Sequence, residues 1–108
     1  MSVDKIAALQ EILKQNPQDA FARYGLAMEY VHRNQPDLAL AQFDHLQAQH
    51  PDYTAGYQMA AQTLLRMGRV EEAQARLRLG IACAQRTGNQ HARNEMEAML
   101  EEQREHST

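Results

Sequence analysis

The chain has 108 residues, 44% of them hydrophobic, which is enough to fill the core of one domain. Its 11 basic and 14 acidic residues leave a formal charge of −3, which disfavours nucleic acid as a partner because phosphate binding needs clustered positive charge. The single cysteine excludes an internal disulfide. Residues 1–15 lack the apolar run of a signal peptide, and no stretch approaches the roughly 18 apolar residues of a membrane span. We therefore expect a cytoplasmic protein without membrane contacts.

A first helix is predicted over residues 2–16, with Ser2 as a suitable N-cap and Pro17 beyond its end. One apolar stripe recurs at helical spacing and consists of Val3, Ile6, Leu9, Ile12 and Leu13. Leu9 precedes Phe43 by 34 positions, and the same shift relates many apolar positions further along the chain. This helix therefore takes the place of the second half of a preceding repeat.

A first full repeat is predicted over residues 20–53. Its first helix, from about Asp19 to Arg33, is apolar on nearly all sides and needs cover on more than one of them. Asn34 suits the left-handed conformation of a turn, and Pro36 suits the first turn of the next helix. That second helix, which ends before Pro51, is expected to direct four side chains inward: Leu38, Ala39, Phe43 and Leu46.

A second full repeat follows over residues 54–87. Its positions match those of the first repeat in four pairs, namely Ala27 with Ala61, Tyr30 with Leu64, Ala39 with Ala73 and Phe43 with Leu77. Gly68 lies 34 positions after Asn34, so the two turns share a preference for positive φ. Gln85 occupies the place where a third proline, after Pro17 and Pro51, is expected. The paired alanines favour close approach of the helices within each hairpin.

A capping helix is predicted over residues 89–105, after the break at Gly88. One of its faces is apolar and consists of Ala92, Met96, Met99 and Leu100. The other face is acidic and consists of Glu95, Glu97, Glu101, Glu102 and Glu105. Such a helix can close the end of a repeat array, because one face packs and the other is solvated.

These offsets resemble the tetratricopeptide repeat, a helix hairpin that recurs every 34 positions with large and small residues at fixed places. The first unit supplies Leu26, Ala27, Tyr30, Ala39, Phe43 and Pro51, and has Arg23 where the family has a bulky residue. The second unit supplies Tyr57, Ala60, Ala61, Gly68 and Ala73. The resemblance implies an all-α superhelix of antiparallel helix hairpins with about six helices. It would form a single domain over residues 1–108, made of a half repeat, two full repeats and a cap.

In this family the first helices of the units line a concave groove that binds a peptide or a helix of another protein. By register, the resemblance places eight residues in the groove: Phe21, Tyr24, Met28, Val31, Ala55, Gln58, Gln62 and Leu65. The alternative is that Tyr24 and Met28 belong to the core and are covered by the last helix. The family's clamp for a C-terminal carboxylate is disfavoured, because Tyr24, Met28 and Gln62 stand at its positions.

Residues 66–93 are rich in arginine, and the register places Arg66, Arg86 and Arg93 near the rim of the groove. These three are candidate contacts for an acidic ligand. The alternative is that they belong to solvated helix faces and pair with acids one helical turn away.

No metal, cofactor or enzymatic activity is expected. His45 and His50 are five positions apart, whereas two ligands on one helix face need a spacing of about four. Cys83 lies among small apolar residues and is interpreted as a buried hydrophobic side chain. No phosphate-binding loop, pair of acids or catalytic triad pattern is present in the sequence.

The sequence thus predicts an adaptor that binds another protein through the groove. The alternative is a structural unit that assembles with copies of itself through the open ends of its repeats, as a weak homodimer.

Overall fold

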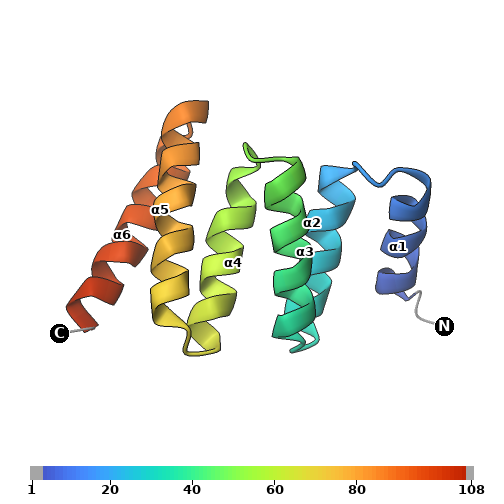
Figure 1. The fold of residues 1–108 in the computed structure, drawn as a ribbon, viewed down its shortest axis with the longest axis horizontal. Helices are drawn as coiled ribbons and strands as arrows, with labels where there is room; N and C mark the ends of the chain where they lie inside the picture. Colours follow the sequence, from blue (N-terminus) through green and yellow to red (C-terminus); the bar gives the residue numbers. More distant parts are fainter. Residues whose placement is uncertain (1–3, 107–108) are drawn as a thin grey trace.

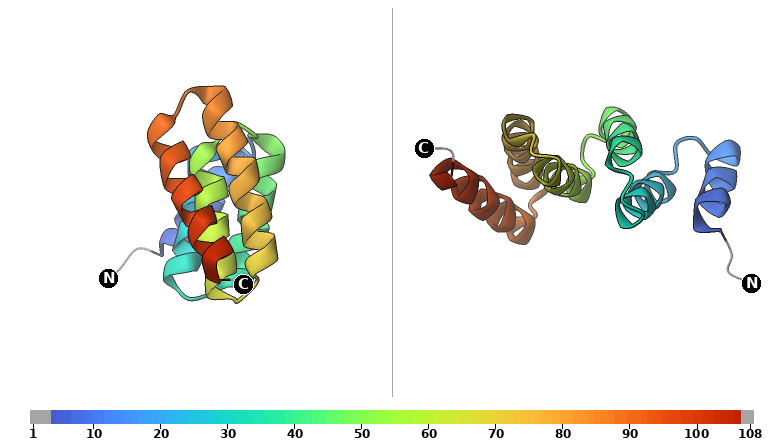
Figure 2. Two further views of the ribbon diagram at one scale, coloured as in Figure 1. Left: turned by 90° about the vertical axis from the view of Figure 1, so that its left-hand side faces the viewer. Right: turned by 90° about the horizontal axis from the view of Figure 1, so that it is seen from below.

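The computed structural model describes residues 4–106, which form six helices and no strand in that part of the chain. The helices are α1 (Lys5–Gln15), α2 (Ala20–His32), α3 (Pro36–Gln49), α4 (Thr54–Arg66), α5 (Val70–Thr87) and α6 (Gln90–His106). They stand side by side in chain order, and the longest dimension of the molecule, 47 Å, runs along the stack (Figure 1). Helices α2, α4 and α6 lie on one side of the stack, α3 and α5 on the other, and α1 at one end (Figure 2). The predicted all-α array of helix hairpins is confirmed.

Polar side chains begin three of the helices. Asp4 accepts a hydrogen bond from the backbone N–H of Ile6 at 3.0 Å, and Asp19 accepts one from Ala22 at 2.9 Å. Asn89 accepts one from Ala92 at 3.1 Å. Each such bond satisfies a donor that the first turn of a helix leaves without a backbone partner. The N-cap predicted at Ser2 lies outside the described residues, and Asp4 caps the helix where it begins.

The turns inside the two hairpins have the same backbone conformation. Asn34 has φ of 57° and Gly68 has φ of 75°, so both residues adopt the left-handed region that the sequence predicts for them. Gly88, with φ of 72°, ends α5 in the same way. Positive φ reverses the chain within a few residues, and consecutive helices are therefore antiparallel neighbours.

The core follows the spacing of the repeat. Ala27, Ala39, Ala61 and Ala73 are all 0% exposed, as expected for alanines where two helices approach closely. The large side chains Phe43 and Leu77 fill the space beside them at 1% and 0% exposure. Cys83 is also buried, as predicted.

Arg23 takes over a contact that an aromatic residue makes in the second hairpin. The hydroxyl of Tyr57 donates to the carbonyl oxygen of Pro51 at 2.7 Å. Arg23 occupies the position equivalent to Tyr57 in the first repeat, and its Nη2 donates to the carbonyl oxygen of Pro17 at 3.2 Å. Nη1 of Arg23 also donates to Gln42 on α3 at 2.9 Å. The guanidinium group therefore ties α2 to the preceding loop and to α3 without a bulky ring.

Helix α5 runs further than α3. A shift by one repeat from the end of α3 would end α5 at Cys83, but the helix continues to Thr87. Pro51, which follows the end of α3, cannot donate a backbone hydrogen bond, whereas Gln85 at the equivalent position can. Because α5 is longer by about one turn, α6 begins later in the chain than the 34-residue repeat would place it.

Helix α6 packs against α5 and also touches α4. Met96 is 0% exposed and lies beside Gly80, where the missing side chain allows α5 and α6 to approach closely. Ala92, Met99 and Leu100 pack against the same core, so the predicted apolar face of α6 is confirmed. No helix within residues 4–106 has the length and apolarity needed to cross a bilayer.

Two predicted core residues are exposed instead. Leu38 is 46% exposed, and its neighbour Leu40 is buried at 7%. Each residue turns an α-helix by about 100°, so a shift of two positions changes the face. The counterpart of Leu38 in the second repeat is Glu72, which is also exposed. Ile12 is 46% exposed because α1 packs mainly against α2 alone, leaving its opposite face in solvent.

Candidate functional site

Four of the predicted groove residues form a stripe on α2. Phe21, Tyr24, Met28 and Val31 are spaced so that they share one face of the helix. Phe21 is 79% exposed, an unusually large exposure for an aromatic side chain. Tyr24, Met28 and Val31 are half-buried and pack against the core. We call these four residues the α2 stripe.

Tyr24 stands in an aromatic cluster that joins α2, α3 and the loop before α4. Its ring centroid lies 5.3 Å from that of Tyr53 and 6.3 Å from that of Phe43, within the range of favourable ring contacts. Burial raises the pKa of Tyr24, and the charge of Tyr53 adds to the shift. Burial also raises the pKa of Tyr53, with a further contribution from Asp19. Both hydroxyls are therefore neutral at pH 7, and the cluster is an apolar surface with polar tips.

The matching residues on α4 are Ala55, Gln58, Gln62 and Leu65. Ala55 is exposed, and the other three are half-buried. Gln58 Nε2 lies 3.5 Å from Glu95 Oε2 and 3.9 Å from Met99 Sδ, so α6 partly covers this stripe. The α2 stripe is different, because the described ring neighbours of Tyr24 come from α3 and from the loop before α4.

The three candidate arginines are not brought together. Arg86 donates to Asp52 at 2.9 Å and to the carbonyl oxygen of Pro51 at 3.2 Å, and the bond to Asp52 raises its pKa. Arg93 pairs with Glu97 one turn away at 2.9 Å. Arg66, at the C-terminal end of α4, has no side-chain hydrogen bond or ion pair within residues 4–106. The ends of α4 and α5 that carry Arg66 and Arg86 lie at opposite edges of the stack (Figure 1).

Comparison of this chain with known proteins shows which family it belongs to. No family model and no curated protein matches the chain. Among solved structures, a tetratricopeptide repeat domain protein from Salinibacter ruber is 30% identical, with a TM-score of 0.77. The match covers 82% of this chain and 89% of that one. The chain belongs to the tetratricopeptide repeat family.

Two further structures share the fold of this tetratricopeptide repeat protein at lower identity. The type III secretion translocator chaperone SycD of Yersinia enterocolitica is 19% identical with a TM-score of 0.87, and the match covers 94% of this chain and 71% of that one. Protein BPP2914 of Bordetella parapertussis is 24% identical with a TM-score of 0.83, and the match covers 98% of this chain and 91% of that one. At identities below 25%, the similarity shows a shared fold and nothing about function.

Sequence reasoning missed one residue of the aromatic cluster in this tetratricopeptide repeat protein. Tyr53 is the last residue of the first repeat, and its counterpart one repeat earlier is Asp19, so the repeat pattern does not mark it. The signal that could have found it is its position two places after Pro51, in the loop between α3 and α4. Tyr53 widens the apolar surface around Tyr24.

Proposed function

We propose that this protein is an interaction scaffold that binds a peptide or a helix of a partner protein along the α2 stripe, with the α4 residues Ala55, Gln58, Gln62 and Leu65 as the second wall. The observation that carries the proposal is the exposure of Phe21 on the same helix face as three half-buried apolar side chains. Exposed apolar patches of this kind mark binding sites, because leaving them in water is unfavourable.

The position of α6 supports the same proposal. The helix packs on α5 and α4, so it covers part of the α4 wall and does not fold across Tyr24 and Met28. Binding rather than catalysis is proposed, since the groove residues are aromatic, aliphatic and amide side chains. SycD, which shares the fold, is by its name a type III secretion translocator chaperone, and a protein partner for this chain agrees with that name.

Phe21 gives a sharp test, because it is largely exposed and its removal leaves the core intact. Phe21→Ser should weaken binding to a groove partner about tenfold or more, as expected for the loss of a large aromatic contact. Leu79→Ser on α5 is the matched control, because Leu79 is 49% exposed on a different helix and outside the groove.

The experiment compares proteins captured from a lysate by the wild type and by the two variants, with quantitative mass spectrometry as the readout. Partners retained by the wild type and by Leu79→Ser, but lost with Phe21→Ser, support the proposal. Identical capture by all three proteins would refute it. Circular dichroism checks that both variants remain helical.

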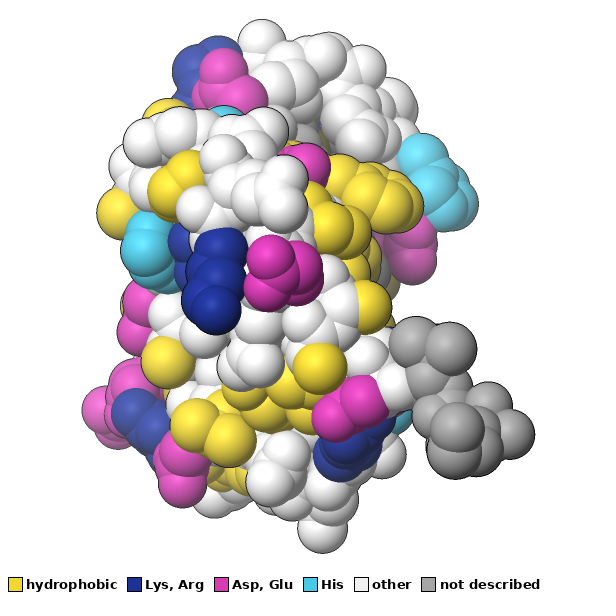
Figure 3. Space-filling view, turned by 90° about the vertical axis from the view of Figure 1, so that its right-hand side faces the viewer, with side chains coloured by type: hydrophobic (Ala, Val, Ile, Leu, Met, Phe, Trp, Pro, Cys, Tyr) yellow, Lys and Arg dark blue, Asp and Glu magenta, His cyan; other side chains and the backbone are white. Residues whose placement is uncertain are grey.

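A second candidate function, self-assembly, is favoured by the exposed outer face of α1. Ile12 is 46% exposed beside a shallow hollow lined by Ala8, Glu11, Ile12, Gln15 and Asn16. Figure 3 shows hydrophobic side chains gathered on this end of the molecule. A stable dimer buries about 800 Å² on each partner, more than one short helix face offers, so the homodimer would be weak. Sedimentation velocity at micromolar concentration should show a dimer that Ile12→Glu removes, and a wild-type protein that is strictly monomeric would exclude this candidate.

A further inference from the structure

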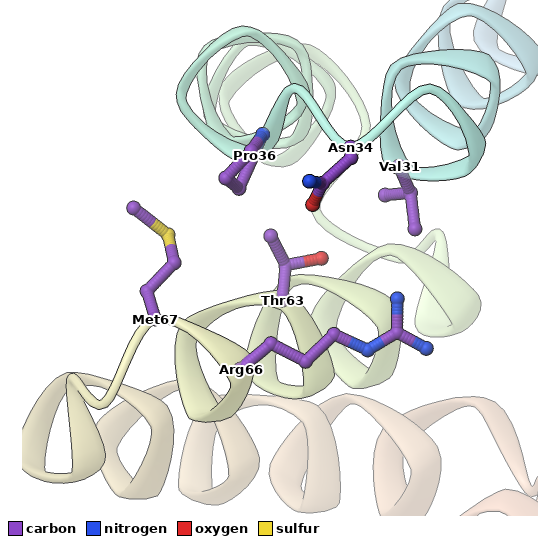
Figure 4. A pocket seen from close by; sticks show the side chains of 6 residues that line it. All are labelled: Val31, Asn34, Pro36, Thr63, Arg66 and Met67. Carbon is purple, nitrogen blue, oxygen red and sulfur yellow. The ribbon is translucent and has the colours of Figure 1, made fainter.

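A small cleft lies between the C-terminal ends of α2 and α4. Its walls come from Val31, Asn34, Pro36, Thr63, Arg66 and Met67 (Figure 4). Its volume is about 80 Å³. A water molecule takes up about 30 Å³ and a typical ligand pocket starts near roughly 300 Å³, so the cleft admits the end of one side chain and no cofactor.

The floor of the cleft is apolar. Val31 and Met67 are half-buried and pack against the core. Thr63 is 3% exposed, and its hydroxyl donates to the carbonyl oxygen of Met59 at 2.8 Å. That bond uses the only proton of the hydroxyl, so Thr63 offers no donor to an incoming ligand.

Two polar side chains without partners in residues 4–106 border this floor, Asn34 from the turn after α2 and Arg66 from the end of α4. Arg66 has no side-chain partner within the described residues, and Gln62, its neighbour one helical turn earlier, carries no charge. The amide of Asn34 likewise makes no side-chain hydrogen bond in that part of the chain. Figure 4 shows the Asn34 amide directed toward α4, and the Arg66 side chain lying along α4 with its guanidinium group on the side of Val31.

This arrangement selects a carboxylate. A guanidinium group only donates, and an ionised carboxylate only accepts, with two oxygens that match the fork of arginine. The amide of Asn34 can add a further donor through its NH2 group. The methylene groups of an acidic side chain would contact Val31 and Met67. A neutral amide of the same shape would lack the ionic attraction, and a purely apolar side chain would leave both donors without partners.

We propose that the cleft receives the carboxylate of an aspartate or glutamate side chain of the bound partner. This inference rests on the proposed groove, since Val31 is both the last residue of the α2 stripe and a wall of the cleft. It adds a specificity rule: the partner carries an acidic residue roughly 15 Å from the residue that contacts Phe21, because Phe21 and Val31 are ten positions apart on one helix.

Three tripeptides, two of them blocked at both ends, test the inference without a known partner. The peptides are acetyl-Leu-Glu-Leu-amide, its glutamine analogue, and the glutamine analogue with a free C-terminal carboxylate. Each is titrated into the full chain while amide NMR shifts are followed. The glutamate peptide should shift the amides of Val31, Asn34 and Met67 and bind roughly threefold or more tightly than the other two, as for an exposed ion pair.

Arginine variants complete the test. Arg66→Gln should remove the preference for the glutamate peptide. Arg66→Lys should retain part of this preference, because lysine keeps the positive charge but lacks the forked geometry of arginine. Arg78→Gln is the matched control, because Arg78 is also exposed and without a partner in the described chain but lies on α5 outside the cleft. Equal binding of glutamate and glutamine peptides, equal binding of the free C-terminus, or an effect of Arg78→Gln as large as that of Arg66→Gln would overturn the inference.

The binding groove and the carboxylate cleft can be refuted independently of each other. Phe21→Ser should leave the tripeptide shifts unchanged, because Phe21 is distant from the cleft. If the cleft shows no preference while capture of partners still depends on Phe21, only the carboxylate site is refuted.

Discussion

A change of one glycine in α5 tests how α6 closes the array. Gly80 is buried, and a Cβ atom placed there would lie 2.8 Å from the Cβ of Tyr57 and would also clash with the sulfur of Met96. The thioether can move, but the Cβ of Tyr57 is fixed by the backbone of α4. We therefore expect Gly80→Ala to push α5 away from both neighbours.

The magnitude follows from two opposing terms. Overpacking in a filled core costs about 1–3 kcal/mol. Replacing glycine by alanine inside a helix stabilises by roughly 0.5–1 kcal/mol. The free energy of unfolding should therefore fall by about 1 kcal/mol, and by no more than about 2.5 kcal/mol.

Gly25 in α2 provides the matched control. A Cβ at Gly25 would lie 3.4 Å from Leu9 Cδ2, which is an ordinary van der Waals contact. Gly25→Ala should therefore keep only the helix-propensity gain and raise the free energy of unfolding by roughly 0.5–1 kcal/mol. The same substitution thus has opposite signs in two helices.

Thermal and urea unfolding, followed by far-UV circular dichroism, measure the difference. A gap of about 2 kcal/mol corresponds to a separation of about 8–16 °C in Tm for a domain of this size. Amide hydrogen exchange should increase along α6 in Gly80→Ala and stay unchanged there in Gly25→Ala. If both variants are stabilised equally, α6 does not pack against Gly80 and the reasoning is refuted.

Two further predictions concern the turns and the tyrosines. Asn34→Ala should cost about 1 kcal/mol in urea unfolding, because alanine resists the φ of 57° at this position, and Asn34→Gly should be close to neutral; equal losses would contradict this explanation. Burial is the largest cause that raises the pKa of Tyr24, Tyr53 and Tyr57 above the usual 10.0, so the unfolded chain releases these protons first as pH rises. The stability that these groups contribute should therefore be level below about pH 10 and fall above it, with a smaller fall in Tyr24→Phe. A urea midpoint that stays constant through this range would show that the rings are not buried.

The proposed groove depends on features that the sequence showed only in part. The register placed Phe21, Tyr24 and Met28 on one helix face, and α2 is helical over that whole stretch. Their exposure could not be read from the same pattern, because Phe21 belongs to a helix that is apolar on nearly all sides. Exposure depends on where α6 docks, and three helices separate α6 from α2 along the chain.

The sequence by itself determined the architecture of this protein. Alanines and large apolar residues 34 positions apart, together with Asn34 and Gly68 at the turns, specify helix hairpins because each of these signals acts over a few neighbouring residues. Only the tertiary structure decided which stripe stays open, which arginine lacks a partner and how far α5 extends before α6 turns back. Those outcomes depend on surfaces that meet only when distant helices pack, and no local pattern encodes such contacts.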